Sequence, residues 1–253
     1  MFNTDGLDKA RNDFKNNRFC VIDNIIKEPW IGQLYKCLPR MNMGYWMCAG
    51  HKHQKVSQEQ AKTLNMDDFK SYHRTASQED FGYWHRAKWI IKEEDFIEND
   101  YPRVIEFTRV VCEDYTLGKP DTTFLDIAEY ISGFPNMVTK EPSYSAYDNE
   151  SWLNPHHDPR RWLAYIFYFN PGWKAHWGGQ LCIMNKDETT IKHSIEPFGN
   201  RLLIMDVSET TGHRINKHFI SPVSYTAPYP RYSLAGWFSP RDPDGAVPVM
   251  RGT

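Results

Sequence analysis

The 253-residue sequence predicts an α+β fold that is mainly β, with N-terminal helices supporting a jelly-roll sandwich, a double-stranded β-helix. Two segments of the first 120 residues have apolar side chains at helical spacing. From about residue 122, short apolar or alternating runs recur at roughly 8- to 15-residue spacing between Gly, Pro, Asn and Asp, which is typical of a sandwich or barrel. No exposed linker divides the two parts. We therefore expect one domain over residues 1–253, with helical support at 1–120 and the jelly-roll core at 121–240.

The first half contains one expected strand and two expected helices. The run "RFCVIDNII" at 18–26 is rich in β-branched residues and predicts a strand. Residues 28–41 have apolar side chains at helical spacing, and so do residues 101–118, where Gly118 is expected to end the helix. Residues 45–90 are polar, studded with aromatics and without a clear period, so we expect irregular structure there.

The second half predicts seven or eight strands, because each short run is apolar or alternating and is bounded by turn-forming residues. The expected strands lie within residues 123–131, 141–148, 162–170, 178–184, 193–206, 218–225 and 231–238. Gly178 and Gly179 are interpreted as a tight turn or bulge between two of them.

Composition excludes several classes of function. A hydrophobic content of 40% and a charged content of 25% are ordinary for a globular chain, and a net charge of −2 gives no broad basic surface for nucleic acid or anionic lipid. The sequence has no apolar run of transmembrane length, and its start is too polar for a signal peptide. The five cysteines form no CxxC pair and are interpreted as reduced thiols, so we expect a cytoplasmic protein. The sequence predicts no oligomeric state.

The stretch "NPHHDPRRW" contains a candidate metal site. In a strand, His156 and Asp158 would point to the same face while His157 points away. Two histidines and one carboxylate leave three coordination positions open, which suits non-haem Fe(II) that must also bind a cosubstrate and O₂. His218 is the best placed third ligand, and His213 is second. The competing interpretation is a surface hydrogen bond between a histidine and an aspartate.

Arg231 opens the alternating strand "RYSLAGWF". An arginine that points into a sandwich is costly unless a carboxylate meets its planar fork, and this strand offers no acidic partner. A bound dicarboxylate would supply one. Alternatively, Arg231 is simply exposed at the end of its strand.

Five ordered motifs carry a family resemblance. The HxD motif is followed by "YFNPGWKAHWGGQL", "FGNRLLIMD", "HFISPV" and "RYSLAGWF". This order resembles the prolyl-hydroxylase branch of the Fe(II)/2-oxoglutarate-dependent dioxygenases and is most similar to the peptidyl-prolyl hydroxylases. The resemblance covers roughly residues 125–240.

The resemblance implies that His156, Asp158 and His218 are the catalytic iron ligands. It implies Fe(II) as cofactor, 2-oxoglutarate and O₂ as cosubstrates, and ascorbate as a candidate reductant. The expected reaction hydroxylates an unactivated C–H bond of a prolyl or amino-acyl residue, or of a free amino acid, and releases succinate and CO₂. The alternatives are a natural-product oxygenase of the same superfamily, and a cupin-type metal-binding protein or isomerase that needs no cosubstrate.

The same resemblance assigns three residues to 2-oxoglutarate. Arg231 would form a salt bridge with the distal carboxylate, Tyr168 would donate a hydrogen bond to it, and Tyr147 would lie on the cosubstrate side of the pocket. Each tyrosine could instead be a core aromatic whose hydroxyl has a backbone partner.

Residues 43–90 are expected to form a lid over the sandwich mouth, because this long segment mixes aromatic side chains with Arg and His. Tyr83, Trp84 and Arg86 are the residues expected to contact substrate. The alternative is a structural flap whose aromatic residues are anchored in the core.

Overall fold

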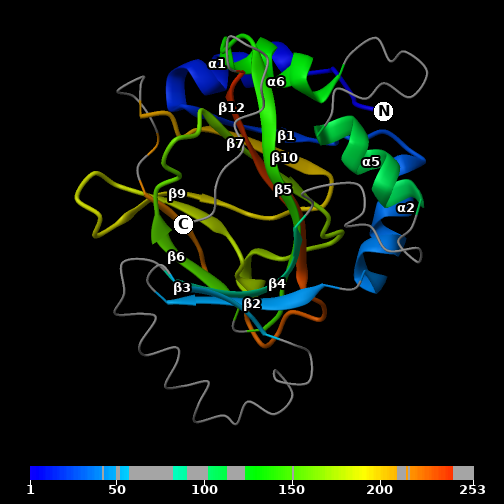
Figure 1. The fold of residues 1–253 in the computed structure, drawn as a ribbon, viewed down its shortest axis with the longest axis vertical. Helices are drawn as coiled ribbons and strands as arrows, with labels where there is room; N and C mark the ends of the chain where they lie inside the picture. Colours follow the sequence, from blue (N-terminus) through cyan, green and yellow to red (C-terminus); the bar gives the residue numbers. More distant parts are fainter. Residues whose placement is uncertain are drawn as a thin grey trace.

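A computed structural model describes residues 1–41, 43–49, 52–56, 82–89, 102–112, 123–149, 151–209, 215 and 217–241 (Figure 1). Its helices are α1 (Leu7–Asn17), α2 (Trp30–Cys37), α5 (Pro102–Cys112) and α6 (Phe124–Ser132), with 3-10 turns η1 (Leu38–Arg40) and η3 (Ala175–Trp177). Its strands are β1 (Phe19–Asp23), β2 (Gly44–Ala49), β3 (Lys52–Val56), β4 (Gly82–Trp89), β5 (Met137–Tyr147), β6 (Trp152–His156), β7 (Leu163–Tyr168), β8 (Leu181–Met184), β9 (Ile191–Ile195), β10 (Arg201–Asp206), β11 (His218–Ile220) and β12 (Arg231–Pro240).

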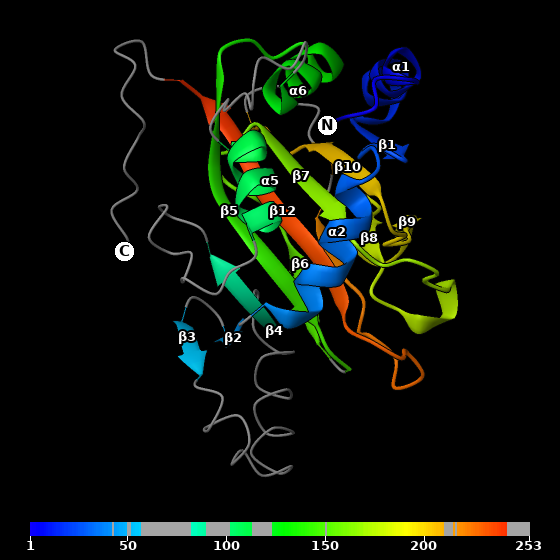
Figure 2. The same ribbon diagram turned by 90° about the vertical axis from the view of Figure 1, so that its right-hand side faces the viewer.

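The strands form one curled antiparallel sheet in the order β1-β10-β7-β12-β5-β4-β6-β11-β8-β9, with β2 pairing with both β3 and β4. Figure 2 shows α2, α5 and α6 on one side of the strands β5, β7 and β12. The predicted mainly β, jelly-roll architecture with supporting helices is confirmed. None of the described helices is long and apolar enough to cross a membrane.

The central strand β7 separates two apolar layers. All six of its residues are buried, because helices cover one of its faces and the curled sheet covers the other. Leu163, Tyr165 and Phe167 pack with the helices, whereas Ala164, Ile166 and Tyr168 point to the interior. The period of two therefore places Tyr168 inside the sandwich.

The prediction of a strand at 123–131 is wrong, because these residues form helix α6. The buried residues Phe124, Ile127, Ala128 and Ile131 have helical spacing. Thr123 and Asp126 form a capping box, in which each side chain accepts a hydrogen bond from the other residue's backbone N–H. The N-terminal cap and the helical period therefore outweigh the β-like composition of the run.

The prediction of irregular structure at 45–90 is wrong for the described parts of that segment, which form β2, β3 and β4. Strand β4 pairs with both β5 and β6 and is therefore part of the sandwich wall. Helix α5 confirms the expected helix from 102 to 112, while Gly118 lies outside the described residues. The strand expected at 18–26 and the helix expected at 28–41 are present as β1 and α2 with η1.

Candidate metal centre

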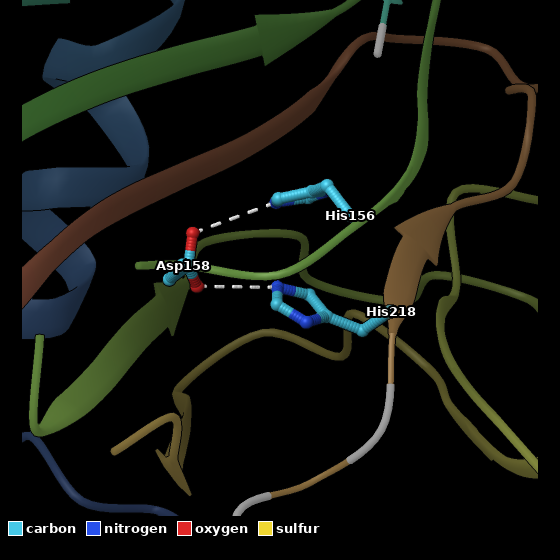
Figure 3. Close-up of side chains that lie close together, drawn as sticks. All are labelled: His156, Asp158 and His218. Atoms are coloured by element: carbon cyan, nitrogen blue, oxygen red, sulfur yellow. Dashed lines mark ion pairs between the residues drawn. The ribbon is translucent and has the colours of Figure 1, made fainter. Parts of the chain in front are cut away.

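The structure brings His156, Asp158 and His218 together inside the sandwich (Figure 3). His156 ends β6 and His218 begins β11, and the two residues are direct partners in the antiparallel pair. The His156 Nε2 atom lies 3.6 Å from Asp158 Oδ1, and the His218 Nε2 atom lies 3.4 Å from Asp158 Oδ2. One potential ligand atom from each residue lies within 4.8 Å of the others, which is close enough for one ion.

The reason expected for the pairing of His156 and Asp158 is wrong, although the two side chains do meet. Strand β6 ends at His156, so Asp158 belongs to the following loop rather than to the same strand face. Pro159 follows and has no backbone N–H with which to continue a ladder, and Arg160 has a positive φ of 62°. The turn at 158–161, not strand alternation, brings the carboxylate back toward the imidazoles.

The protonation of this cluster suits a divalent cation. The Nδ1 atom of His156 lies 2.8 Å from the backbone carbonyl oxygen of Asn154, which favours the tautomer with Nδ1 protonated and Nε2 free to bind. Burial, and next the neighbouring His218, lower the pKa of His156 to about 4. Burial alone would raise the pKa of Asp158, but the hydrogen bond and attraction from His218 outweigh it and hold that pKa well below its usual range.

Arg231 lies on the same interior and is fully buried, so it is not an exposed arginine at a strand end. Its Nη1 atom donates a hydrogen bond of 3.2 Å to Ser233 Oγ. Within the described part of the chain, neither Nε nor Nη2 has a hydrogen-bond partner, and no carboxylate pairs with the guanidinium. A buried charge without an anion is costly, so this arrangement is that of an anion-binding pocket.

Two tyrosines flank this guanidinium. The Arg231 Cζ atom lies 4.8 Å from the ring centroid of Tyr147 and 4.9 Å from that of Tyr168. The hydroxyl of Tyr168 is buried and has no hydrogen-bond partner among the described residues. Gly179 leaves room for the arginine, because a Cβ there would lie 2.9 Å from Arg231 Cδ and its φ is +69°. The pocket therefore presents the Nε and Nη2 groups of Arg231 and the hydroxyl of Tyr168, for which the described residues provide no acceptor.

These two groups of residues fit the two components that the sequence predicts. Two imidazole nitrogens and one carboxylate form the donor set of a facial iron site with open positions. The unpaired guanidinium N–H groups and the phenol hydroxyl match a carboxylate, which accepts such hydrogen bonds through two oxygens.

The residues expected in the lid lie on β4 and are packed more deeply than a mobile lid would require. Tyr83 and Trp84 are each 6% exposed. Arg86 donates two hydrogen bonds, of 2.7 and 2.8 Å, to the two carboxylate oxygens of Asp148. His213 lies outside the described residues.

Three residues that complete the interior were not expected from the sequence: Asn154, whose carbonyl orients His156; Ser233, which accepts a hydrogen bond from Arg231; and His85, which stacks on Tyr147. The alternation of Tyr83, His85 and Ala87 was the available signal for His85, because a strand would place all three on one face.

Comparisons with known proteins agree with this geometry. Residues 142–239 match the family model described as 2OG-Fe(II) oxygenase superfamily, and these residues include the clustered His156, Asp158 and His218 and the buried Arg231. No curated protein matches the sequence.

Solved structures share the fold. A prolyl-4-hydroxylase from Pseudomonas putida is 17% identical, with a TM-score of 0.55 over 93% of this chain and 99% of that chain. A prolyl hydroxylase from Trichoplax adhaerens is 16% identical, with a TM-score of 0.56 over 94% and 93%. A 2OG-Fe(II) oxygenase family oxidoreductase from Burkholderia pseudomallei is 9% identical, with a TM-score of 0.54 over 94% and 92%.

The sheet order, the interior cluster of two histidines and one aspartate, and the matched segment lead to one conclusion. Residues 142–239 resemble the 2OG-Fe(II) oxygenase superfamily, and the chain as a whole has the fold of solved prolyl hydroxylases.

Proposed function

We propose that this protein is an Fe(II)- and 2-oxoglutarate-dependent dioxygenase that hydroxylates an unactivated C–H bond of a prolyl or amino-acyl residue, or of a free amino acid. In this proposal His156, Asp158 and His218 hold the iron. Arg231 and Tyr168 bind the distal carboxylate of 2-oxoglutarate, and Tyr147 packs beside them. The overall reaction converts substrate, O₂ and 2-oxoglutarate into hydroxylated substrate, succinate and CO₂.

The observation that carries the proposal is the unpaired guanidinium of Arg231. A buried arginine normally has an anionic partner, and here the described residues provide only the Ser233 hydroxyl. A cupin-type isomerase or metal-binding protein without a cosubstrate would have no use for such a group. A bound dicarboxylate, with one end on the metal and the other end on Arg231, would provide the anionic partner.

The protein residues contribute position, charge and exclusion of water. The Asn154 carbonyl holds His156 in the tautomer that leaves Nε2 free, and Asp158 contributes the one negative charge of the ligand set. Arg231 and Tyr168 donate hydrogen bonds to the distal carboxylate from a fully buried setting, where such bonds are strong. When bound, the iron and 2-oxoglutarate would supply the electrons that activate O₂.

Two observations support the proposed substrate class: the shared fold and the peptide bound to one structurally similar enzyme. The Trichoplax adhaerens enzyme was solved with a peptide fragment of the hypoxia inducible factor oxygen degradation domain. We infer a substrate of the same chemistry here, a prolyl or amino-acyl unit, with a small natural product as the second candidate.

A substrate panel tests the proposal. Purified protein with Fe(II), 2-oxoglutarate and O₂ would be incubated with proline-containing peptides, free amino acids and small natural products. Mass spectrometry should find a gain of one oxygen atom in a prolyl or amino-acyl product, together with succinate, and neither with Arg231→Gln at low 2-oxoglutarate. Oxygen gain only in the natural products would overturn the substrate class, and no 2-oxoglutarate consumption with any of them would overturn the function.

A further inference from the structure

His85 is a buried imidazole on β4 whose ring stacks on a residue of the proposed cosubstrate pocket. It is 7% exposed, and its ring centroid lies 4.7 Å from that of Tyr147 with an interplanar angle of 15°. The centroid of the Tyr83 ring lies 5.0 Å from that of His85. His85 therefore packs against two aromatic rings in the sandwich wall.

The order of the strands places Tyr147 between His85 and Arg231. Strands β4, β5 and β12 are neighbours, and Arg231 is the direct register partner of Tyr147. Arg86 pairs with Ala146, so His85 is next to Tyr147 on the same face of the sheet. The Cζ atom of Arg231 lies 4.8 Å from the centroid of the Tyr147 ring. The three side chains thus form a row across three strands.

The charge state of His85 suits this place. Burial, and next the charge of Arg231, lower the pKa of His85 to about 3, so its imidazole is neutral and adds no second cation beside the guanidinium. Its Nδ1 atom has no hydrogen-bond partner among the described residues. Among the described residues, His85 therefore interacts through its flat ring, which contacts the rings of Tyr83 and Tyr147.

We propose that His85 is a positioning residue for 2-oxoglutarate: its ring holds Tyr147 against Arg231 and so sets the shape of the pocket for the distal carboxylate. The proposal rests on the proposed function. Without the stacked ring, the space beside Tyr147 would let that side chain move away from the guanidinium. The Arg231–Tyr147 contact would weaken, and the arginine would be held less firmly for its carboxylate partner.

The test is calorimetric titration of 2-oxoglutarate into protein loaded with Mn(II), which needs no turnover. His85→Ala should weaken 2-oxoglutarate binding about 3- to 10-fold, the range expected for losing one aromatic stack. His85→Phe keeps a flat neutral ring and should stay within about twofold of the wild type. Mn(II) affinity should be unchanged in both variants, because His85 contacts none of the three clustered ligands.

His193→Ala is the matched control, because His193 also makes a ring contact, 4.9 Å from Phe19, but at the β9 edge. It should leave 2-oxoglutarate affinity unchanged. If His85→Ala does not fold, His85→Leu removes the flat ring while keeping most of the volume and should show the same loss.

Each remaining outcome is decisive. Wild-type affinity in His85→Ala would overturn the proposal, and so would an equal loss in His85→Phe, which would make the imidazole nitrogens the important atoms. A changed KM for the primary substrate with unchanged 2-oxoglutarate affinity would make His85 a substrate contact instead. If the wild type itself binds no 2-oxoglutarate, it is the proposed function that fails.

Discussion

His218 lies directly opposite His156 across the β6–β11 pair, with ring centroids 4.4 Å apart. A slip of one residue in this register would turn one of the two imidazoles to the opposite face of the sheet. The pairing of two short strands therefore determines whether a two-histidine site exists, and Asp158 then closes it from the loop.

Replacing any one of the three proposed iron ligands should cause a large loss of metal binding. His156→Ala, Asp158→Ala and His218→Ala should each abolish turnover and bound iron, because a site with three protein ligands cannot lose one and keep its geometry. Metal content and succinate formation measure the two effects. His157→Ala and His213→Ala are the controls and should keep most activity. An active His218→Ala beside an inactive His213→Ala would show that the third ligand is His213.

Replacing Arg231 should selectively weaken the affinity for the cosubstrate 2-oxoglutarate. Removing a charge-assisted contact costs about 1.5–3 kcal/mol, so Arg231→Gln should raise the KM for 2-oxoglutarate about ten- to a hundredfold. Iron affinity should change far less, because Arg231 does not belong to the metal cluster. An unchanged KM for 2-oxoglutarate would remove Arg231 from the cosubstrate pocket.

Two glycines provide a matched test of the space around Arg231. Gly179 and Gly172 both have positive φ, +69° and +72°, but only a Cβ at Gly179 would meet the arginine, whereas one at Gly172 would meet nothing within 4 Å. Both alanine variants should lower the melting temperature, because alanine is strained at positive φ. Only Gly179→Ala should also raise the KM for 2-oxoglutarate. Equal kinetic effects would mean that the space beside Arg231 is not limiting.

The ion pair between Arg86 and Asp148 changes what a variant of Arg86 should do. The pair connects β4 to the end of β5. Arg86→Ala and Asp148→Asn should therefore lower the rate of hydroxylation, and the ratio of hydroxylated product to succinate, to a similar extent. Product and succinate measured in the same reaction give the coupling ratio. If only Arg86→Ala uncouples the reaction, Arg86 contacts the substrate, as the sequence alone led us to expect.

Most strands of the core were predictable because apolar alternation and turn residues mark them locally, but β6 was not among the expected runs and the single run expected at 193–206 forms the two strands β9 and β10. Helix α6 was not predictable, since a nine-residue apolar run fits a buried strand and a helix equally well until its Thr123–Asp126 cap is considered. Helix α1 was also missed, because only Ala10 and Phe14 are buried on an otherwise polar segment.

The candidate site, too, could be predicted only in part from local sequence patterns. The types and order of His156, Asp158 and His218 could be found in the sequence, but the turn that places Asp158 could not, because it depends on where β6 ends. His85 was missed because its role arises from the pairing of β4 with β5, two strands far apart in the sequence. Non-local strand pairing is what the sequence left open.

The central claim is that iron held by His156, Asp158 and His218 turns over 2-oxoglutarate bound at Arg231. The most direct measurement is succinate formation from 2-oxoglutarate under O₂ in the wild type and in His218→Ala, each with and without added Fe(II). The account predicts succinate only in the wild type with Fe(II), at a slow rate without primary substrate and faster with it. Equal succinate formation by His218→Ala, or none by the iron-loaded wild type with any substrate of the panel, would contradict it.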